Sequence, residues 1–327
     1  MSKYIFNIRQ FDSVLNATTS ATTGNDLSPE IKEYYSDYLI DLAEAKLVHD
    51  QFGQNRPIPQ GHGKTIEFRK FNQLAKITTA LVEGVTPEGQ ALDSSALEAT
   101  VAQYGGYVII TDVLDLTAID DVKTEATKLI GSQAGRSLDT VTREVLNGGT
   151  NVQYHEGERA NRAAITADDT LTVKAIQAAV RTLKRQNAEK IDGSYVGIIH
   201  PDVSYDLMND PAWVEWQKYT TPEKMYEGEI GRIAGVRFVE TTEAKIFEKA
   251  GTSGMDIYST LIIADNAYGK TDIEGGGLQL IVKAKGSAGT ADPLDQRSTI
   301  GWKAMKTAER LVEDYMVRIE TACTFNA

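Results

Sequence analysis

Cysteine is nearly absent from this sequence, because its 327 residues include only Cys323. A single cysteine excludes a disulfide within the chain and fits a reducing compartment such as a bacterial cytoplasm. No paired histidine is indicated for Cys323. We therefore expect a small core-facing residue near the end of a strand rather than a catalytic nucleophile.

Long hydrophobic runs are absent as well. No window approaches the roughly 20 apolar residues that a membrane helix needs, and the opening MSKYIFNIRQFDSVLN lacks the apolar run of a signal peptide.

Positive charge is in deficit, since the net charge is -12. This balance works against tight, sequence-independent nucleic-acid binding and favours solubility. We predict a chain that is made and kept in water, with no membrane partner.

The most suggestive short motif is GHGKT at residues 61–65, which ends like a phosphate-binding loop. Such a loop needs a glycine five residues before its second one. That position is Ile58, and its neighbours Pro57 and Pro59 cannot donate backbone amides. The following TIEFRKF alternates like a strand, whereas a phosphate loop opens a helix. A polar turn leading into an extended arm is the better interpretation.

Other catalytic signatures are missing too. His155 lies in YHEGE, which lacks the second histidine of a zinc-protease helix, and His200 precedes Pro201 as a packed or capping residue. The acidic pairs at 120–121 and 168–169 precede predicted helices, where carboxylates satisfy free amides. We predict no catalytic residue, no metal ligand and no cofactor.

Helical periodicity marks three segments. A helix is predicted from Ser28 to about Asp50, after a small polar stretch at 17–25. A longer one begins near Asp120 and ends before Gly148, and its roughly 27 residues would span roughly 40 Å. Its single apolar stripe indicates that it lies along a sheet. TVKAIQAAVRTLKRQ predicts a further amphipathic helix, which the buried strand YVGIIHP follows in the α/β manner.

Residues 53–107 contain the most informative pattern. They alternate at TIEFRKF, AKITTALV and LEATVAQY with no helical stripe. More than 50 mostly extended residues exceed an ordinary loop, because connections beyond about 15 residues are uncommon in compact domains. A two-stranded projection is not stable alone, so it must find partner surface elsewhere.

The closing segment DQRSTIGWKAMKTAERLVEDYMVRIETACTF alternates in two arms. Ile300, Trp302 and Ala304 share one face of the first arm, and Tyr315, Val317 and Ile319 share one face of the second. We predict two long antiparallel strands that form a final hairpin.

Taken in order, these segments resemble the major capsid proteins of tailed bacteriophages, in particular those of N-four-like short-tailed phages. The resemblance runs from about Ser28 to Phe325 and is most specific at GEIGRIAGVRFVETT and PLDQRSTIGWKAM. It implies an α+β fold, the phage major capsid fold named after phage HK-ninety-seven, with an extended loop, a long spine helix, a peripheral antiparallel sheet and an α/β axial domain.

The resemblance also implies a division of the chain. The parts are 1–52 as amino-terminal arm and helix, 53–107 as extended loop, 108–164 as peripheral domain with a spine helix at 119–147, 165–272 as axial domain, and 273–327 as peripheral-domain strands. Some shells of this fold join subunits covalently through a Lys and an Asn. Lys64, Lys70 and Lys76 match no motif for that chemistry, so it is not carried over.

We therefore predict a structural protein rather than an enzyme: a major capsid subunit that self-assembles into hexamers and pentamers of an icosahedral head around double-stranded DNA. Portal, scaffolding and decoration proteins are further partners, the DNA is enclosed without sequence-specific binding, and assembly takes place in the host cytoplasm. The residues expected to contact a neighbouring subunit are Lys64, Phe68, Arg69, Lys70, Phe71, Ile77 and Leu81. An encapsulin-like compartment and a cytosolic α/β enzyme remain as alternatives.

Overall fold

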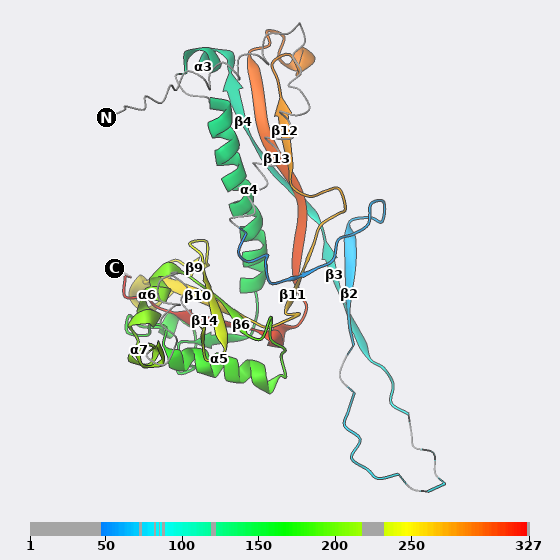
Figure 1. Cartoon of the computed structure of the whole chain (residues 1–327), viewed down its shortest axis with the longest axis vertical. Helices are drawn as coiled ribbons and strands as arrows, with labels where there is room; N and C mark the ends of the chain where they lie inside the picture. The colour runs from blue at the N-terminus through cyan, green and yellow to red at the C-terminus, as the bar shows by residue number, and fades with distance from the viewer. Residues whose placement is uncertain are drawn as a thin grey trace, which may run out of the picture.

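The computed structural model describes residues 47–71, 74–81, 83–84, 86, 89–118, 122–217 and 232–325. These residues form a tall sheet with a long helix along it, an α/β unit at the foot of that helix, and a projecting hairpin (Figure 1). The stretch 17–25 and the helix predicted from Ser28 lie outside the described residues. At its predicted end, residues 47–50 form a loop and turn rather than helix.

The tall sheet has five strands among the described residues. They are β1 (Gln54–Asn55), β4 (Ala102–Thr111), β11 (Tyr268–Thr271), β12 (Gln279–Lys283) and β13 (Arg297–Arg310). β13 is the central strand: it pairs antiparallel with β4 along one edge and with β12 and β11 along the other. The alternation of Ile300, Trp302 and Ala304 places all three on the face that the long helix covers.

That helix is α4 (Val122–Asn147), which confirms the predicted long helix. Its 26 residues span about 39 Å at 1.5 Å per residue. Ala126, Ile130, Ala134 and Leu138 recur at every fourth position and pack against β4 and β13. The opposite face is polar apart from Leu129, which is 69% exposed, and the helix lies on the sheet as the sequence predicted.

The α/β unit is built on a second sheet with seven strands among the described residues. They are β5 (Val152–Tyr154), β6 (Tyr195–Ile199), β7 (Arg232–Ile233), β8 (Val236–Glu240), β9 (Ile246–Phe247), β10 (Ile257–Ile263) and β14 (Met316–Thr321). Three helices belong to this unit: α5 (Val173–Arg185), α6 (Pro201–Asn209) and α7 (Pro211–Gln217). β6 and β10 are buried along their whole length, which explains their uninterrupted apolar sequences.

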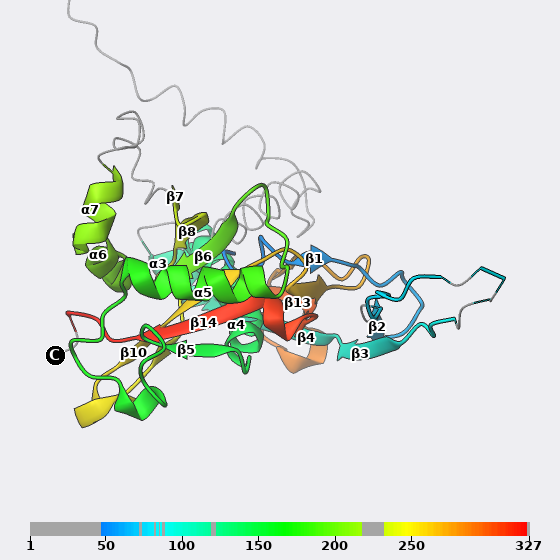
Figure 2. The ribbon, with the colours of Figure 1, turned by 90° about the horizontal axis from the view of Figure 1, so that it is seen from below.

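The α5 helix covers one face of this sheet (Figure 2). Thr172 caps its first turn by accepting a hydrogen bond from the Ala175 amide, and Ile176, Val180 and Leu183 enter the core. Trp213 of α7 is buried in the same core. The predicted amphipathic helix and the strand after it are confirmed.

The predicted final hairpin is wrong. β13 belongs to the tall sheet, whereas β14 lies between β5 and β10 in the sheet of the α/β unit. The chain crosses from one sheet to the other through a 3-10 turn at Glu313–Tyr315. Alternation shows that each segment is a strand but does not identify its partner. Residues 316–321 therefore pair with β10, in the predicted axial part of the chain, and with β5, and not with the strands at 273–310.

The remaining elements are short. They are α3 (Asp112–Thr117), the hairpin strands β2 (Thr65–Phe71) and β3 (Ser94–Thr100), and 3-10 turns at Arg162–Ala164, Thr252–Gly254 and Gly289–Ala291. The described residues of AKITTALV, 75–81, whose alternation indicated extended chain, form no strand. None of the helices in the described residues combines the length and apolarity needed to cross a membrane.

Candidate functional site

The hairpin of β2 and β3 is the feature that the sequence predicted would need a partner. The two strands pair antiparallel from Thr65 opposite Thr100 to Phe71 opposite Ser94, and this two-stranded sheet has no further strand among the described residues. Beyond Phe71, residues 74–81, 83–84, 86 and 89–93 form no helix or strand and lie well away from both sheets (Figure 1). The described residues of the projection are therefore not folded back onto either sheet.

Four large apolar side chains of this loop face solvent. Leu74 is 49% exposed, Ile77 73%, Leu81 75% and Leu92 73%. Scattered single exposed apolar residues are ordinary on a monomer, whereas a group of them on one projection marks a contact surface. Ile77 and Leu81, predicted as contacts, are thus available to a neighbouring molecule.

Phe68 requires a correction. Its side chain is only 4% exposed, because it packs against the backbone of Gly269 in β11, where an added Cβ would lie 3.0 Å from the ring. The Arg56 guanidinium lies 6.0 Å from the ring centroid. Phe68 therefore anchors the hairpin to its own chain, and its side chain is not free to contact a neighbour.

The charged candidates differ in their surroundings. Lys64 is exposed, while Arg69 donates to Glu67 two residues away at 2.9 Å. The hydrogen bond and charge of Arg69 lower the pKa of the Glu67 carboxyl. Glu67 lies directly opposite Glu98, and like charges at such positions repel. Lys70 and Phe71 belong to β2, but their side chains lie outside the described part of the chain.

The residues weighed for chemistry have structural roles. Gly61 and Gly63 adopt positive φ in a turn before β2, so no helix follows GHGKT. His200 caps α6 by accepting from the Asp202 amide at 3.2 Å, as predicted. Asp169 does not cap a helix: it binds Arg159 at 2.8 Å. Burial raises the pKa of the Cys323 thiol to about 12, which opposes thiolate formation.

A buried polar cluster was not anticipated. The segment before β1 is fixed to α4 because Asp139 accepts from the backbone amides of Val48 and His49 at 2.9 and 2.8 Å. Asp50 accepts from Thr142 at 2.5 Å and pairs with Lys306. Lys306 also donates to the Leu138 carbonyl at 2.8 Å. These contacts tie the chain that leads to the hairpin onto the rigid helix.

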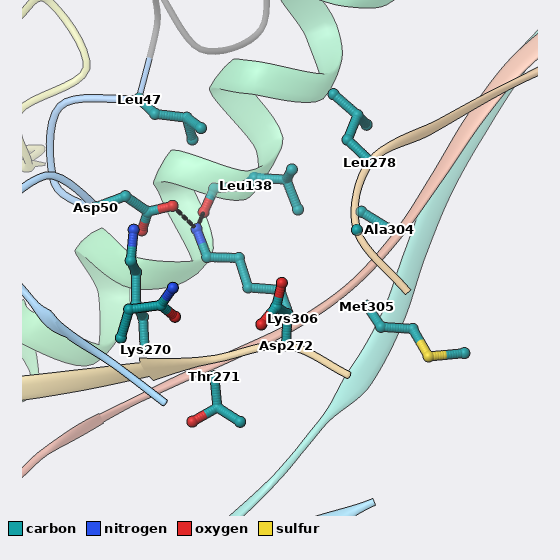
Figure 3. Close-up of a pocket in the computed structure, with 12 residues that line it drawn as sticks. Leu47, Asp50, Leu138, Lys270, Thr271, Asp272, Leu278, Ala304, Met305 and Lys306 are labelled. Atoms are coloured by element: carbon teal, nitrogen blue, oxygen red, sulfur yellow. Dashed lines mark hydrogen bonds and ion pairs between the residues drawn. The ribbon is translucent and has the colours of Figure 1, made fainter. Parts of the chain in front are cut away.

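A cavity of about 240 Å³ adjoins this cluster (Figure 3). Lys306 lies between Asp50 and the Leu138 carbonyl at its wall, and burial lowers the pKa of its amine despite the opposing effect of Asp50. The signal for this cluster was the alternation of β13, which places Lys306 on the inward face with Trp302 and Ala304. No group of three or more histidine, cysteine or acidic side chains suited to a metal occurs in the described ranges.

Comparison with known proteins identifies the family. The sequence matches the family model of phage capsid protein over residues 48–280, which is more than half of its 327 residues. The chain belongs to the phage capsid protein family. Its place is accordingly the shell of a virion. Curated proteins give no match to this sequence.

Solved capsids share the fold of this phage capsid protein. The capsid chain of cyanophage Pam1 superimposes with a TM-score of 0.66 at 16% identity, with 100% of each chain covered. The capsid of cyanophage P-SCSP1u superimposes with a TM-score of 0.65 at 16% identity, with 85% of this chain and 88% of that chain covered. These likenesses confirm the predicted phage capsid fold. The narrower placement among N-four-like phages stays a prediction.

The encapsulin alternative shares this fold more distantly. The SrpI encapsulin of Synechococcus elongatus gives a TM-score of 0.52 at 9% identity, with 96% of each chain covered. Because the family match is to phage capsid proteins, neither an encapsulin-like compartment nor a cytosolic enzyme is favoured.

Proposed function

We propose that this chain is the major subunit of a tailed-phage head and that its hairpin loop lies on a neighbouring copy. Repetition of this contact forms hexamers and pentamers, which build an icosahedral shell around double-stranded DNA. The observation that carries the proposal is the projecting loop, whose Ile77, Leu81 and Leu92 are each more than 70% exposed.

The construction of the hairpin supports this function. Its base is fixed, since Phe68, Ala99 and Val101 are buried and the Val101 amide donates to the Lys64 carbonyl at 2.8 Å. Its far end contacts neither sheet (Figure 1). A head-to-tail contact between identical subunits generates closed rings, and an arm held rigidly at its base presents its loop at a defined angle. Lys64, Arg69, Lys70 and Phe71 are proposed as flanking contacts.

The parts of the chain receive corresponding roles. Residues 53–107 are the extended loop, α4 is the spine of the peripheral domain, and residues 165–272 are the axial domain. We propose that residues 316–321 also belong to the axial domain, and the pairing of β14 with β10 supports this. The chain acts without catalysis or cofactor, meets portal, scaffolding and decoration proteins, and assembles in the host cytoplasm. Its charge of -12 favours DNA that is enclosed rather than tightly bound by the wall as a whole.

Replacing two loop residues tests this function. Ile77→Ser with Leu81→Ser removes apolar contact area without adding charge, so we expect shells to be lost and unassembled chains to accumulate. The matched control is Thr78→Ser with Thr79→Ser in the same exposed loop. Electron microscopy and sedimentation velocity measure the result. Normal shells from the Ile77 and Leu81 variant would contradict a contact through this loop.

A further inference from the structure

The solvent-facing side of α5 carries a row of cationic side chains to which the proposed shell function assigns no role. The helix contains Lys174, Arg181, Lys184 and Arg185 and no acidic residue, in a chain of net charge -12. Lys174 pairs with Glu156 and Glu158. The other three are exposed and have no ion pair with another side chain in the part of the chain that the structure describes.

These three cations border a hollow. Arg181, Lys184 and Arg185 line it together with Gln177 and Ala234, and its volume is about 490 Å³. Among the described residues, no carboxylate belongs to this lining. Cations in the last turn of a helix are favoured by its dipole, but only by about 0.3–1 kcal/mol each. Within the described part of the chain the row is therefore a positive surface with no carboxylate beside it, and such surfaces direct association toward negative ones.

The position of α5 indicates what covers it. Figure 1 looks down the shortest axis of the molecule, and there α5 forms the lower edge of the α/β unit. Seen from below, α5 lies in front of the sheet (Figure 2). A subunit that tiles a thin wall with its shortest axis across that wall meets its neighbours along its edges. The hairpin projects toward the same side as α5 (Figure 1), so a copy beneath the hairpin also faces α5.

A complementary surface lies on the side of the α/β unit that faces α4. Residues 240–243 border a second hollow of about 530 Å³, which Ser132 and Arg136 of α4 also line. Glu240 is exposed and has no cationic partner among the described side chains. Glu243 is held by Arg136 at 2.9 Å. The two hollows share no lining residue, so this acidic edge and the cationic row are different surfaces of one subunit, as a head-to-tail contact requires.

We propose that the cationic row of α5 docks on the acidic edge around Glu240 of a second copy, beside the hairpin contact. This inference rests on the proposed shell function and adds a partner surface to it. The hairpin loop supplies apolar area, and the α5 row sets the register between neighbouring subunits through charge. Because such pairs are partly exposed, salt weakens them.

A charge exchange tests the pairing. Arg181→Glu with Lys184→Glu should raise the protein concentration needed for assembly roughly tenfold or more, because like charges then meet across the contact. Adding Glu240→Lys and Thr242→Lys to the two α5 substitutions should restore assembly, because opposite charges meet again. These two changes leave the ion pair between Glu243 and Arg136 intact. Lys283→Glu with Lys303→Glu, which makes the same charge change outside the α/β unit, is the control. Sedimentation velocity at several salt concentrations measures assembly, and circular dichroism checks that each variant folds.

Three results would overturn the inference: assembly of the α5 pair at the control's concentration, no recovery in the combined variant, or normal shells that only retain less DNA. The last would mean that the row faces the genome. In each case the wild type and the control still form shells, so the proposed function survives. It fails separately if the wild type forms no shells or if the Ile77 and Leu81 variant assembles normally.

Discussion

The α/β unit and the hairpin loop differ in how far their apolar side chains are buried within one chain. The unit buries its apolar residues in a core shared by α5, α6, α7 and the second sheet. The loop leaves Ile77 and Leu81 in solvent and contacts little beyond itself, as in the 3.0 Å hydrogen bond from Gln90 to the Ala75 carbonyl. One region is covered within a single subunit, and the other is proposed to become covered only in an assembly. Stability and assembly should therefore respond to different substitutions.

The largest expected effect is on folding, in the α/β unit. Leu183→Ala removes a fully buried side chain from α5 and should lower the free energy of unfolding by about 2–5 kcal/mol. Gln177→Ala on the exposed face of the same helix is the control and should change it by less than about 0.5 kcal/mol. Denaturant unfolding of the unassembled chain, followed by circular dichroism, gives both values. Equal effects would mean that α5 is not packed as described.

The end of the molecule farthest from the α/β unit sharpens the comparison. None of the residues of α3 is buried, and Leu116 is 82% exposed. A six-residue helix is not stable alone in water, so its apolar side chains need a covering surface. We expect Leu116→Ser with Val113→Ser to leave unfolding unchanged within about 0.5 kcal/mol and to lower the yield of shells severalfold. Thr117→Ser is the control, and particle counts by electron microscopy measure the yield of shells from each variant. An undiminished yield would place α3 outside every contact.

A smaller effect is expected at the flank of the hairpin. Arg69→Glu places a third carboxylate beside Glu67 and the opposing Glu98, and it removes a cation proposed to meet acidic residues of a neighbour. Assembly should weaken while the single chain stays folded, because Arg69 is exposed. Arg69→Lys should retain most of the assembly. Sedimentation velocity distinguishes the variants, and normal shells from Arg69→Glu would refute the role of Arg69.

The comparison also explains which features were predictable from sequence. Periodicity located α4 and α5 because each buries one stripe of its own residues. The excess of extended chain at 53–107 indicated the hairpin, since connections of such length are uncommon in a compact domain, although β1 and residues 102–107 of β4 belong to the tall sheet. Strand partners were harder to predict. β13 and β14 show the same alternation of apolar and polar residues, and the core that each one packs against decides which sheet it joins.

Single side chains at boundaries escaped prediction for a related reason. From the sequence, Phe68 is an apolar residue of a projecting strand. In the structure its ring packs on Gly269 of the same chain, where the lack of a side chain leaves room for it. The partner of Lys306 is Asp50, which is 256 residues away in sequence. Local patterns carry no information about such distant contacts. The cations of α5, by contrast, can be read from the sequence, because the helix contains four basic residues and no acidic one.

The smallest expected effect concerns the attachment of α3. Asp115 binds Lys285 at 3.0 Å and Lys123 at 3.1 Å, and these hydrogen bonds lower the pKa of its carboxyl below the usual 3.8. A carboxyl whose pKa is lower in the folded state stabilises the fold fully above its unfolded value and loses that contribution as the pH falls through the folded value. We therefore expect amide exchange in α3 to accelerate, relative to α4, only below about pH 4. In Asp115→Asn the difference between the two helices should be the same at pH 3 and at pH 6, because no titrating carboxyl remains. A pH-independent difference in the wild type would show that packing, and not these ion pairs, holds α3 in place.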